Sequence, residues 1–410
     1  GATDDVSYFW TWGDGTAEVS GTAFETHVYA PGTYTAKLRV VSGEAETEAL
    51  GSVTAVPHEV TVEVGESIAA ALATGADIVR LASGTHEIAE GLTIDRAVEL
   101  TSVSGDPADT VIYAPRSGNS LRVLKTYYPE SRVVGLTLRG GIVQVPGDFQ
   151  PGSVLWLQDG LVENCILEDG RSYYRAAVWV EGGTLRRSVI RNCQSTSSST
   201  SGAGLGLMAG LVDSCVITNN NTMDNQKDVG NVGGGVYLSG TGVLRNSLVA
   251  SNRAPRGGGI YVEATASGAI ENCTIVGNDA WKEYGVGGGV YVVADSDGLP
   301  PPATIRNNIV WGNAATVASF ELNLPSAFSY SCSPALTAGV NHNLAGDPLF
   351  RRPAKGDWRL RSGSPCVGTG FVADWMSGAT DLRGRARKIG GAVSMGAYEC
   401  MPNGMSIIVR

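Results

Sequence analysis

The sequence contains a repeat between Leu161 and Asn313, which is visible as two columns of residues. In the first column an apolar residue precedes a charged one, and the charge alternates in sign: Val162-Glu163, Leu185-Arg186, Val212-Asp213, Leu244-Arg245, Ile270-Glu271, Ile305-Arg306. The second column follows within five repeats: Val178-Trp179-Val180, Leu205-Gly206-Leu207, Val236-Tyr237-Leu238, Ile260-Tyr261-Val262, Val290-Tyr291-Val292. Successive charged residues are 23 to 35 positions apart. Such a period indicates a solenoid, a propeller or an array.

The content of each repeat favours a parallel β-helix. Every repeat holds two short stretches rich in Val, Ile and Leu, separated by Gly and Asn, which is typical of strands joined by turns. The repeats show no long segment of helical periodicity, which argues against helical repeats. They are also too short for the four strands of a propeller blade. We therefore predict an all-β protein in which each coil stacks on the one before it.

Stacking turns equivalent residues into vertical neighbours. The alternating charges of the first column would then attract weakly between adjacent strands and set the register of the coils. An asparagine occurs seven residues after the charge in four repeats, at Asn220, Asn252, Asn278 and Asn313. We expect these side chains to hydrogen-bond along the stack or to the turn backbone.

Composition excludes several classes of protein. The chain of 410 residues contains 55 Gly, as a turn-rich β fold requires, and carries a net charge of −10. It has no Lys/Arg cluster to neutralise phosphates, so we expect no nucleic-acid partner. No apolar run is long enough for a transmembrane helix. The histidines and cysteines are not spaced as metal ligands, so we expect no metal and no cofactor. We expect a monomer.

Residues 1–56 differ from the repeat and read as strands with tight turns. The segment from Trp10 to Gly15 contains Gly-Asp-Gly, and it is followed by His27-Val28-Tyr29 and Pro31-Gly32-Thr33-Tyr34. This set resembles the PKD domain, a small immunoglobulin-like β-sandwich, although the family's first strand is missing. The resemblance implies an extracellular spacer or a contact for protein or polysaccharide.

Residues 57–325 resemble the pectin-lyase-like right-handed β-helices. The resemblance rests on the repeat and on Asp77 to Leu100, which reads as the first coil. A short helix at Glu66 to Leu72 is expected to cap the open end of the solenoid. Residues 326–410 contain Asp347-Pro348-Leu349-Phe350, Gly363-Ser364-Pro365-Cys366 and Gly396-Ala397-Tyr398-Glu399. That order resembles the C-terminal segment that wraps the last coils of secreted bacterial β-helix proteins, and it implies a secreted or cell-surface location.

The second column supplies the candidate binding site. If its aliphatic residues face inward, Trp179, Tyr237, Tyr261 and Tyr291 face outward as an aromatic strip, with Gly206 as a gap. Sugar rings stack on aromatic faces, so the strip suits a polysaccharide. The same strand carries Glu181, and neighbouring loops carry Tyr174, Trp281 and Tyr284 as further substrate-binding candidates. On this hypothesis Tyr261→Ala weakens glycan binding and leaves stability nearly unchanged. The alternative is that loops cover the rings as a second packed layer.

Catalysis would require ionisable groups beside this strip. Glu181 and Glu263 are three coils apart, about 14 Å by strand spacing, which is too far for a glycosidase pair. Loop residues would have to complete a pair, such as Glu263 with Glu283. A polysaccharide lyase would instead need a base and a partner for a uronate carboxylate, for which Arg256 and Lys227 are candidates.

Three hypotheses of function remain open at this stage. The first is a glycoside hydrolase or polysaccharide lyase, the second a non-catalytic glycan-binding or adhesion module, and the third a structural stalk of a large surface protein. Parallel β-helices serve all three purposes, so the fold alone does not decide among them.

Overall fold

The computed structural model describes residues 6–116, 120–143, 150–195, 201–222, 230–281, 283–317 and 320–401. These residues fall into two compact units. The first comprises the described residues through Val60 together with Gly75–Ile78. The second comprises Thr61–Thr74 and the described residues from Val79 onward.

The first unit is built on one antiparallel sheet. Its strands are β1 (Val6–Thr11), β2 (Val19–Gly21), β3 (Gly32–Ser42) and β4 (Ala45–Ala55), in the order β2-β1-β3-β4. Aromatic rings pack beside the sheet, with Trp12 stacked between Trp10 and His27 at centroid distances of 5.2 and 4.7 Å. No strand forms between residues 22 and 31, and the described part of this unit shows no second sheet. The sandwich, and with it the PKD resemblance, is therefore not confirmed.

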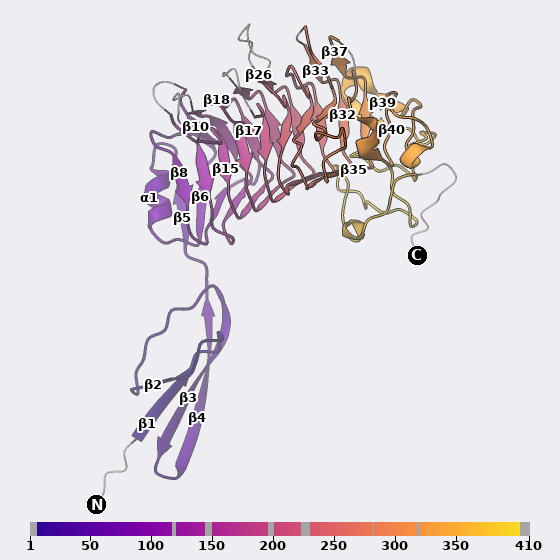
Figure 1. Ribbon diagram of the computed structural model, residues 1–410. Helices are drawn as coiled ribbons and strands as arrows, with labels where there is room; N and C mark the ends of the chain where they lie inside the picture. Colours follow the sequence, from indigo (N-terminus) through magenta and orange to yellow (C-terminus); the bar gives the residue numbers. More distant parts are fainter. Residues whose placement is uncertain are drawn as a thin grey trace, which may run out of the picture. The chain divides into compact units, whose positions relative to one another are not determined.

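The second unit is a stack of parallel strands, visible in Figure 1 as successive coils from β8 to β35. Its described strands form three long sheets. The eight-stranded sheet contains β8 (Leu92–Ile94), β11 (Leu124–Thr126), β15 (Leu155–Leu157), β19 (Val178–Val180), β23 (Leu205–Leu207), β27 (Val236–Leu238), β30 (Ile260–Val262) and β34 (Val290–Val292). The nine-stranded sheet contains β7 (Gly84–Glu87), β10 (Thr110–Ala114), β13 (Thr137–Gly140), β17 (Ile166–Glu168), β21 (Val189–Arg191), β25 (Val216–Thr218), β29 (Leu248–Ala250), β32 (Thr274–Val276) and β36 (Ile309–Trp311).

The third long sheet has eleven strands among the described residues and carries the charged column. It contains β5 (Glu59–Val62), β6 (Ile78–Leu81), β9 (Glu99–Ser102), β12 (Arg132–Val134), β16 (Leu161–Glu163), β20 (Thr184–Arg186), β24 (Leu211–Asp213), β28 (Val243–Arg245), β31 (Ala269–Glu271), β35 (Thr304–Arg306) and β38 (Phe328–Ser329). Short ladders follow the nine-stranded sheet: β14 (Ile142–Val143), β18 (Arg171–Ser172), β22 (Gln194–Ser195), β26 (Asn221–Thr222), β33 (Asp279–Ala280) and β37 (Ala314–Ala315).

In the coils from β16 to β36, a tight turn joins the eleven-stranded sheet to the nine-stranded sheet. Its residue is left-handed in six successive coils, with φ between 51° and 58°, at Asn164, Arg187, Ser214, Asn246, Asn272 and Asn307. Asparagine tolerates this conformation better than other non-glycine residues, which explains why it recurs at this corner. The turn fixes the angle between the two sheets in these coils.

The predicted charge register is confirmed. Glu163, Arg186, Asp213, Arg245, Glu271 and Arg306 lie opposite one another on successive strands. The charges join as three ion pairs, Glu163–Arg186 at 2.8 Å, Asp213–Arg245 at 3.4 Å and Glu271–Arg306 at 2.5 Å. Because every pair links two coils, the column favours this register over a shifted one.

The predicted asparagine column is also confirmed, and it lies inside the coil. Asn220, Asn252, Asn278 and Asn313, here called the asparagine ladder, are all buried. Each Oδ1 accepts the backbone N–H of the residue one coil below, as in Asn252 N to Asn278 Oδ1 at 2.9 Å. Each Nδ2 donates to a backbone carbonyl, as from Asn278 to Val249 O at 2.9 Å. The ladder thereby satisfies buried backbone groups at the corner where the strands end.

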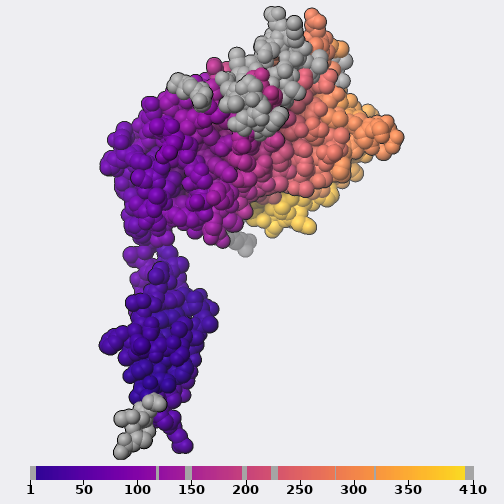
Figure 2. All heavy atoms as spheres, turned by 60° about the vertical axis from the view of Figure 1, so that its left-hand side comes forward, coloured from indigo at the N-terminus to yellow at the C-terminus, as the bar shows by residue number. Residues whose placement is uncertain are grey.

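Both ends of the stack are covered. The helix α1 (Ile68–Ala73) begins after Ser67, whose hydroxyl accepts the Ala70 N–H, and it buries Ile68 and Leu72 over the first coils. At the other end, β39 (Phe350–Arg352) and β40 (Asp357–Leu360) belong to a segment that packs against the late coils. In Figure 2 its orange and yellow atoms lie directly against the stack. This segment contains the short 3-10 helices η1 (Pro325–Ala327), η2 (Val340–His342), η3 (Pro353–Lys355) and η4 (Asp374–Met376).

Candidate functional site

The central residue of each strand in the eight-stranded sheet forms one continuous column. Strand pairing places the members of this column opposite one another in the order Thr93, Lys125, Trp156, Trp179, Gly206, Tyr237, Tyr261, Tyr291. We call this set the ring column. It includes the four predicted rings and extends beyond them toward the first coils.

The ring column lies outside the coil. The aliphatic neighbours Val178 and Val180 are completely buried, as are the equivalent residues of β23, β27 and β30. The rings instead meet charged side chains, since Arg175 lies over Trp179 and Tyr237 hydrogen-bonds Glu263. In each of these strands the flanking residues therefore face inward and the central residue faces outward, as predicted.

The rings do not form an open stacking surface. Tyr261 lies between Tyr237 and Tyr291, with centroid distances of 5.9 and 5.4 Å and interplanar angles of 8° and 6°. Its two faces are thus occupied by neighbouring rings, and only 9% of Tyr261 is exposed. The expectation that every ring offers its face to a sugar is wrong for Tyr261, because the strand spacing of about 4.8 Å brings successive rings into contact.

Trp179 is covered as well. Only 2% of this residue is exposed, and its indole lies against the Cα of Gly206, in the space that a side chain there would occupy. The Arg175 guanidinium lies 4.8 Å from the ring centroid. The sequence predicted a gap in the strip at Gly206. The structure shows instead that Gly206 is the position that accommodates the Trp179 indole.

Two carboxylates border the ring column, two residues further along their strands. Glu181 Oε2 accepts Trp156 Nε1 at 2.9 Å and Gln158 Nε2 at 3.2 Å, while Glu181 Oε1 accepts Trp179 Nε1 at 3.0 Å. Glu263 Oε1 accepts the Tyr237 hydroxyl at 2.9 Å. Both carboxylates are thus bound by neutral donors and fix the orientation of the rings.

The electrostatic environment of Tyr237 and Tyr261 keeps these two phenols protonated. Burial, followed by the charge of Glu263, raises the pKa of Tyr261 to about 12, and the charge of Arg256 opposes this rise. Burial and Glu263 also raise the pKa of Tyr237 above its usual range. A general base requires the opposite shift at neutral pH. These two phenols are therefore suited to donating hydrogen bonds and not to removing protons.

Cations contact the rings of this column: Lys125 belongs to the column itself, whereas Arg122 and Arg175 precede it on their coils. Lys125 Nζ lies 4.3 Å from the Trp156 ring centroid, and Arg122 and Arg175 lie 4.8 Å from the rings of Trp156 and Trp179. Bridges between coils connect Arg175 through Ser201 and Val232 to Arg256. Lys125, Arg175 and Arg256 form no ion pair with any described residue.

Arginines on the other two long sheets behave differently. Each of the following is paired with a carboxylate within 3.4 Å: Arg132, Arg139, Arg186, Arg191, Arg245 and Arg306. Those arginines stabilise the register of the coils, whereas Lys125, Arg175 and Arg256 have no carboxylate partner among the described residues. This difference marks the outer face of the eight-stranded sheet as the candidate site.

The loop residues proposed for catalysis or substrate binding do not lie together at one point. Glu283 is exposed, and no hydrogen bond or ion pair between described residues joins it to Glu263. Trp281 is packed by Arg253, whose guanidinium lies 4.4 Å from the ring centroid and is paired with Asp279. Tyr174 packs edge-on against Tyr173 at 4.5 Å, and Tyr284 is half-buried. Lys227 lies outside the described residues.

Sequence reasoning missed Lys125, Trp156 and Gln158. The signal was present, because Leu155-Trp156-Leu157 repeats the pattern of Val178-Trp179-Val180 and lies one coil before it. The charged column of the repeat begins only at Leu161. A period read from that column does not include Trp156, although Trp156 is paired with Trp179.

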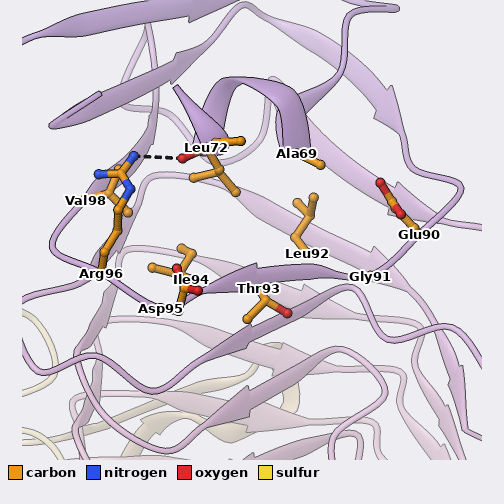
Figure 3. Close-up of a pocket in the computed structure, with 11 residues that line it drawn as sticks. Ala69, Leu72, Glu90, Gly91, Leu92, Thr93, Ile94, Asp95, Arg96 and Val98 are labelled. Carbon is orange, nitrogen blue, oxygen red and sulfur yellow. Dashed lines mark hydrogen bonds between the residues drawn. The ribbon is translucent and has the colours of Figure 1, made fainter. Parts of the chain in front are cut away.

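A groove of about 360 Å³ lies at the first-coil end of the ring column, between α1 and β8. Figure 3 shows Leu92 directed toward α1 and Arg96 bonded to the Leu72 carbonyl, at 2.9 Å. Thr93, the first member of the ring column, also lines this groove. Because Leu92 points toward α1 and Thr93 points away from it (Figure 3), the groove lies beside the end of the ring column and is not part of its outer face.

The described residues indicate neither a metal site nor a membrane-spanning helix. No cluster of three or more His, Cys, Asp or Glu side chains in the described ranges has a metal-binding arrangement. None of the described helices is long and apolar enough to cross a membrane.

Comparison with known families agrees with the geometry of the coils. Residues 153–329 match the family model described as the right handed beta helix region. The matched stretch begins just before β15 and ends at β38, so it covers the rings from Trp156 to Tyr291. A search of curated proteins found no significant match.

Proposed function

We propose that this right-handed parallel β-helix binds an extended anionic polysaccharide along the ring column, as a non-catalytic module of a secreted or cell-surface protein. The observation that carries the proposal is the set of unpaired cations beside the rings. Lys125, Arg175 and Arg256 lie there without carboxylate partners among the described residues, in a chain of net charge −10.

The chemistry of these groups fits uronate or sulfate groups. An arginine offers two parallel N–H donors to a carboxylate or sulfate, and an ammonium acts as a compact positive charge. The carboxylates Glu181 and Glu263 on the opposite border accept hydrogen bonds and can bind sugar hydroxyls. Aromatic edges and phenol hydroxyls between the two borders supply a rigid floor.

The dimensions of the face suit a polymer. Eight strands spaced about 4.8 Å apart extend for roughly 34 Å along the solenoid. The cations recur along this length, so several charges of one chain are bound together. Linked contacts of this kind raise the overall affinity beyond that of a single sugar.

The arrangement does not favour hydrolysis or elimination at the ring column. Glu181 and Glu263 are separated by three strand spacings, about 14 Å, beyond the range of either glycosidase mechanism. Tyr237 and Tyr261 have raised pKa values, which disfavours a tyrosine base. We therefore assign binding and not catalysis to this face.

A structural rod is the second candidate function, and one observation favours it. Trp179 and Tyr261 are 2% and 9% exposed, so part of the column is a packed layer. A rod without ligand would use the same contacts to stiffen the stack. A polysaccharide-binding module requires the unpaired cations for binding, whereas a rod without a ligand does not require them.

The test measures binding of the full chain to polygalacturonate, alginate, heparin and neutral dextran at 50 and 300 mM salt. We expect binding to at least one anionic polymer, a loss of at least tenfold in the double variant Arg175→Ala/Arg256→Ala, and weakening at high salt. The control is Arg132→Ala, which removes an exposed arginine paired with Glu99. Absence of binding to every anionic polymer, or an equal loss in the control, would exclude the proposal and leave the rod.

A further inference from the structure

A second concave site lies between the C-terminal segment and the coils. Its cavity measures about 530 Å³. One wall is formed by the corner turns of two successive coils, around Ser188 and Ser214, and the other by β40 and residues 380–384 with Tyr398. We call this cavity the C-terminal cleft. None of its lining residues belongs to the ring column.

Aromatic side chains define the walls of the cleft. Trp358 and Tyr398 line it and are both half-buried, together with the aliphatic side chains of Val189, Val216 and Leu382. Trp358 also lines a second cavity of about 370 Å³, whose wall includes Trp311. An edge contact with Phe350, at 5.3 Å and 82°, fixes the Trp358 ring between the two cavities. The volume and the aromatic lining are typical of a small-ligand pocket.

The acidic side chains of the cleft already accept hydrogen bonds from other groups of the protein. Asp357 accepts Arg359 Nε at 2.6 Å and Arg359 Nη2 at 2.7 Å, and this pair holds the pKa of Asp357 well below its usual range. Asp381 accepts the backbone N–H groups of Arg383, Arg385 and Glu399 at 2.8 to 2.9 Å. Neither carboxylate is left to attract a cation from solution.

Three arginines near the cleft form no ion pair with a described carboxylate. Arg383 lines the cleft, and Arg351 and Arg385 line a small depression that shares Arg359, Asp381 and Tyr398 with it. All three are exposed and form no ion pair with any residue in the described ranges. The hydrogen bonds of Asp381 hold the backbone of Arg383 and Arg385 in place, so these two guanidiniums are presented from a fixed turn.

From this arrangement we infer that the C-terminal cleft binds a short carboxylated saccharide, with a sugar ring packed against Trp358 and its carboxylate bound where the cleft meets the adjoining depression, by Arg383, which lines both, and Arg385, which lines the depression. An aromatic wall recognises the apolar face of a sugar, and a guanidinium recognises a carboxylate through paired donors. The cleft is bounded by protein on two sides and accommodates a short saccharide, unlike the extended ring column. It is thus a separate site, which does not depend on the function proposed for the ring column.

The experiment titrates the intact chain with digalacturonate and follows binding by calorimetry. Parallel titrations use the neutral disaccharide maltose, a sulfated disaccharide and inorganic sulfate. We expect digalacturonate to bind, maltose not to bind, and the double variant Arg383→Ala/Arg385→Ala to lose at least tenfold in affinity. Trp358→Phe keeps an aromatic wall and should lose less than the arginine variant.

Controls separate this inference from the function proposed above. Arg175→Ala/Arg256→Ala should retain digalacturonate binding at the cleft, and Arg383→Ala/Arg385→Ala should retain polymer binding at the ring column. The inference is overturned if digalacturonate does not bind, or if the arginine variant with a native melting curve binds it as the wild type does. Equal affinity for inorganic sulfate would show a general anion site and would also overturn the inference. Tighter binding of the sulfated disaccharide than of digalacturonate would overturn the assignment of a uronate and identify a sulfated sugar as the ligand.

Discussion

The Glu321 carboxylate closes the asparagine ladder at Asn313. Its Oε2 accepts Asn313 Nδ2 at 2.7 Å, and its Oε1 accepts the Gly312 N–H at 2.7 Å. At the other positions of the ladder the next coil supplies this acceptor, and Asn313 is the last asparagine of the ladder. Glu321 therefore supplies the acceptor that a further asparagine would have provided.

Removal of this carboxylate should destabilise the last coils. Glu321→Ala removes the acceptor of the Gly312 N–H and of the buried Asn313 side-chain and backbone N–H groups, which should cost about 3 kcal/mol of unfolding free energy. Glu321→Gln retains one acceptor oxygen and should cost less. Urea unfolding gives the free energies, and amide exchange of residues 305–315 locates the change. Wild-type stability in Glu321→Ala would show that water replaces the carboxylate.

The buried pair Arg387–Glu399 should make stability depend on pH. The two side chains lie 3.1 Å apart, and burial raises the pKa of Glu399 to about 7 in spite of the opposing charge of Arg387. Because this value lies above the ordinary value of about 4.5, protonated Glu399 favours the folded state. Its contribution to stability is fully present below about pH 4.5 and is lost as the pH rises through about 7.

The comparison with Glu399→Gln isolates this contribution. Unfolding free energies of both proteins are measured at pH 5 and pH 7.5. We expect the wild-type value minus the Gln value to decrease by up to about 3 kcal/mol between these pH values. Other titrating groups affect both proteins equally and cancel. A difference that stays constant, or increases with pH, would contradict the assignment.

Tyr261→Ala should reduce stability, contrary to what the sequence pattern suggested. The ring is 9% exposed and stacked on both faces, so its removal leaves a cavity between Tyr237 and Tyr291. The expected cost is about 3 kcal/mol, seen as a lower melting temperature. Tyr127→Ala serves as the control because Tyr127 is 43% exposed, and it should change the melting temperature little. Equal effects in the two variants would mean that Tyr261 is not packed as described.

Gly206→Ala should displace the Trp179 indole. A methyl group at this position would overlap Cε3 and Cζ3 of that ring, whereas the backbone of Gly206 does not require a glycine conformation. We expect a change in the Trp179 environment, detected by fluorine NMR of fluorotryptophan-labelled protein, with the resonances of distant tryptophans unchanged. Gly346→Ala is the control, since a methyl group there meets no atom within 4 Å. An unshifted Trp179 resonance would contradict this packing.

The sequence by itself determined the coils of this protein. Stacking converts a repeat into columns, so the alternation of Glu163 and Arg186 and the recurrence of Asn252 and Asn278 predicted which residues would be neighbours. Strand alternation likewise placed Val178 inside and Trp179 outside. These features depend on local period and parity, which a sequence displays directly.

Only the tertiary structure decided what the outer surface offers. The exposed area of Trp179 depends on the indole leaning over Gly206 and on Arg175, and that of Tyr261 depends on rings one coil away on either side. The C-terminal cleft joins Ser188 to Trp358, which are far apart in the chain. Side-chain orientation and the path of a non-repeating segment follow from packing over long sequence distances, and no period in the sequence encodes them.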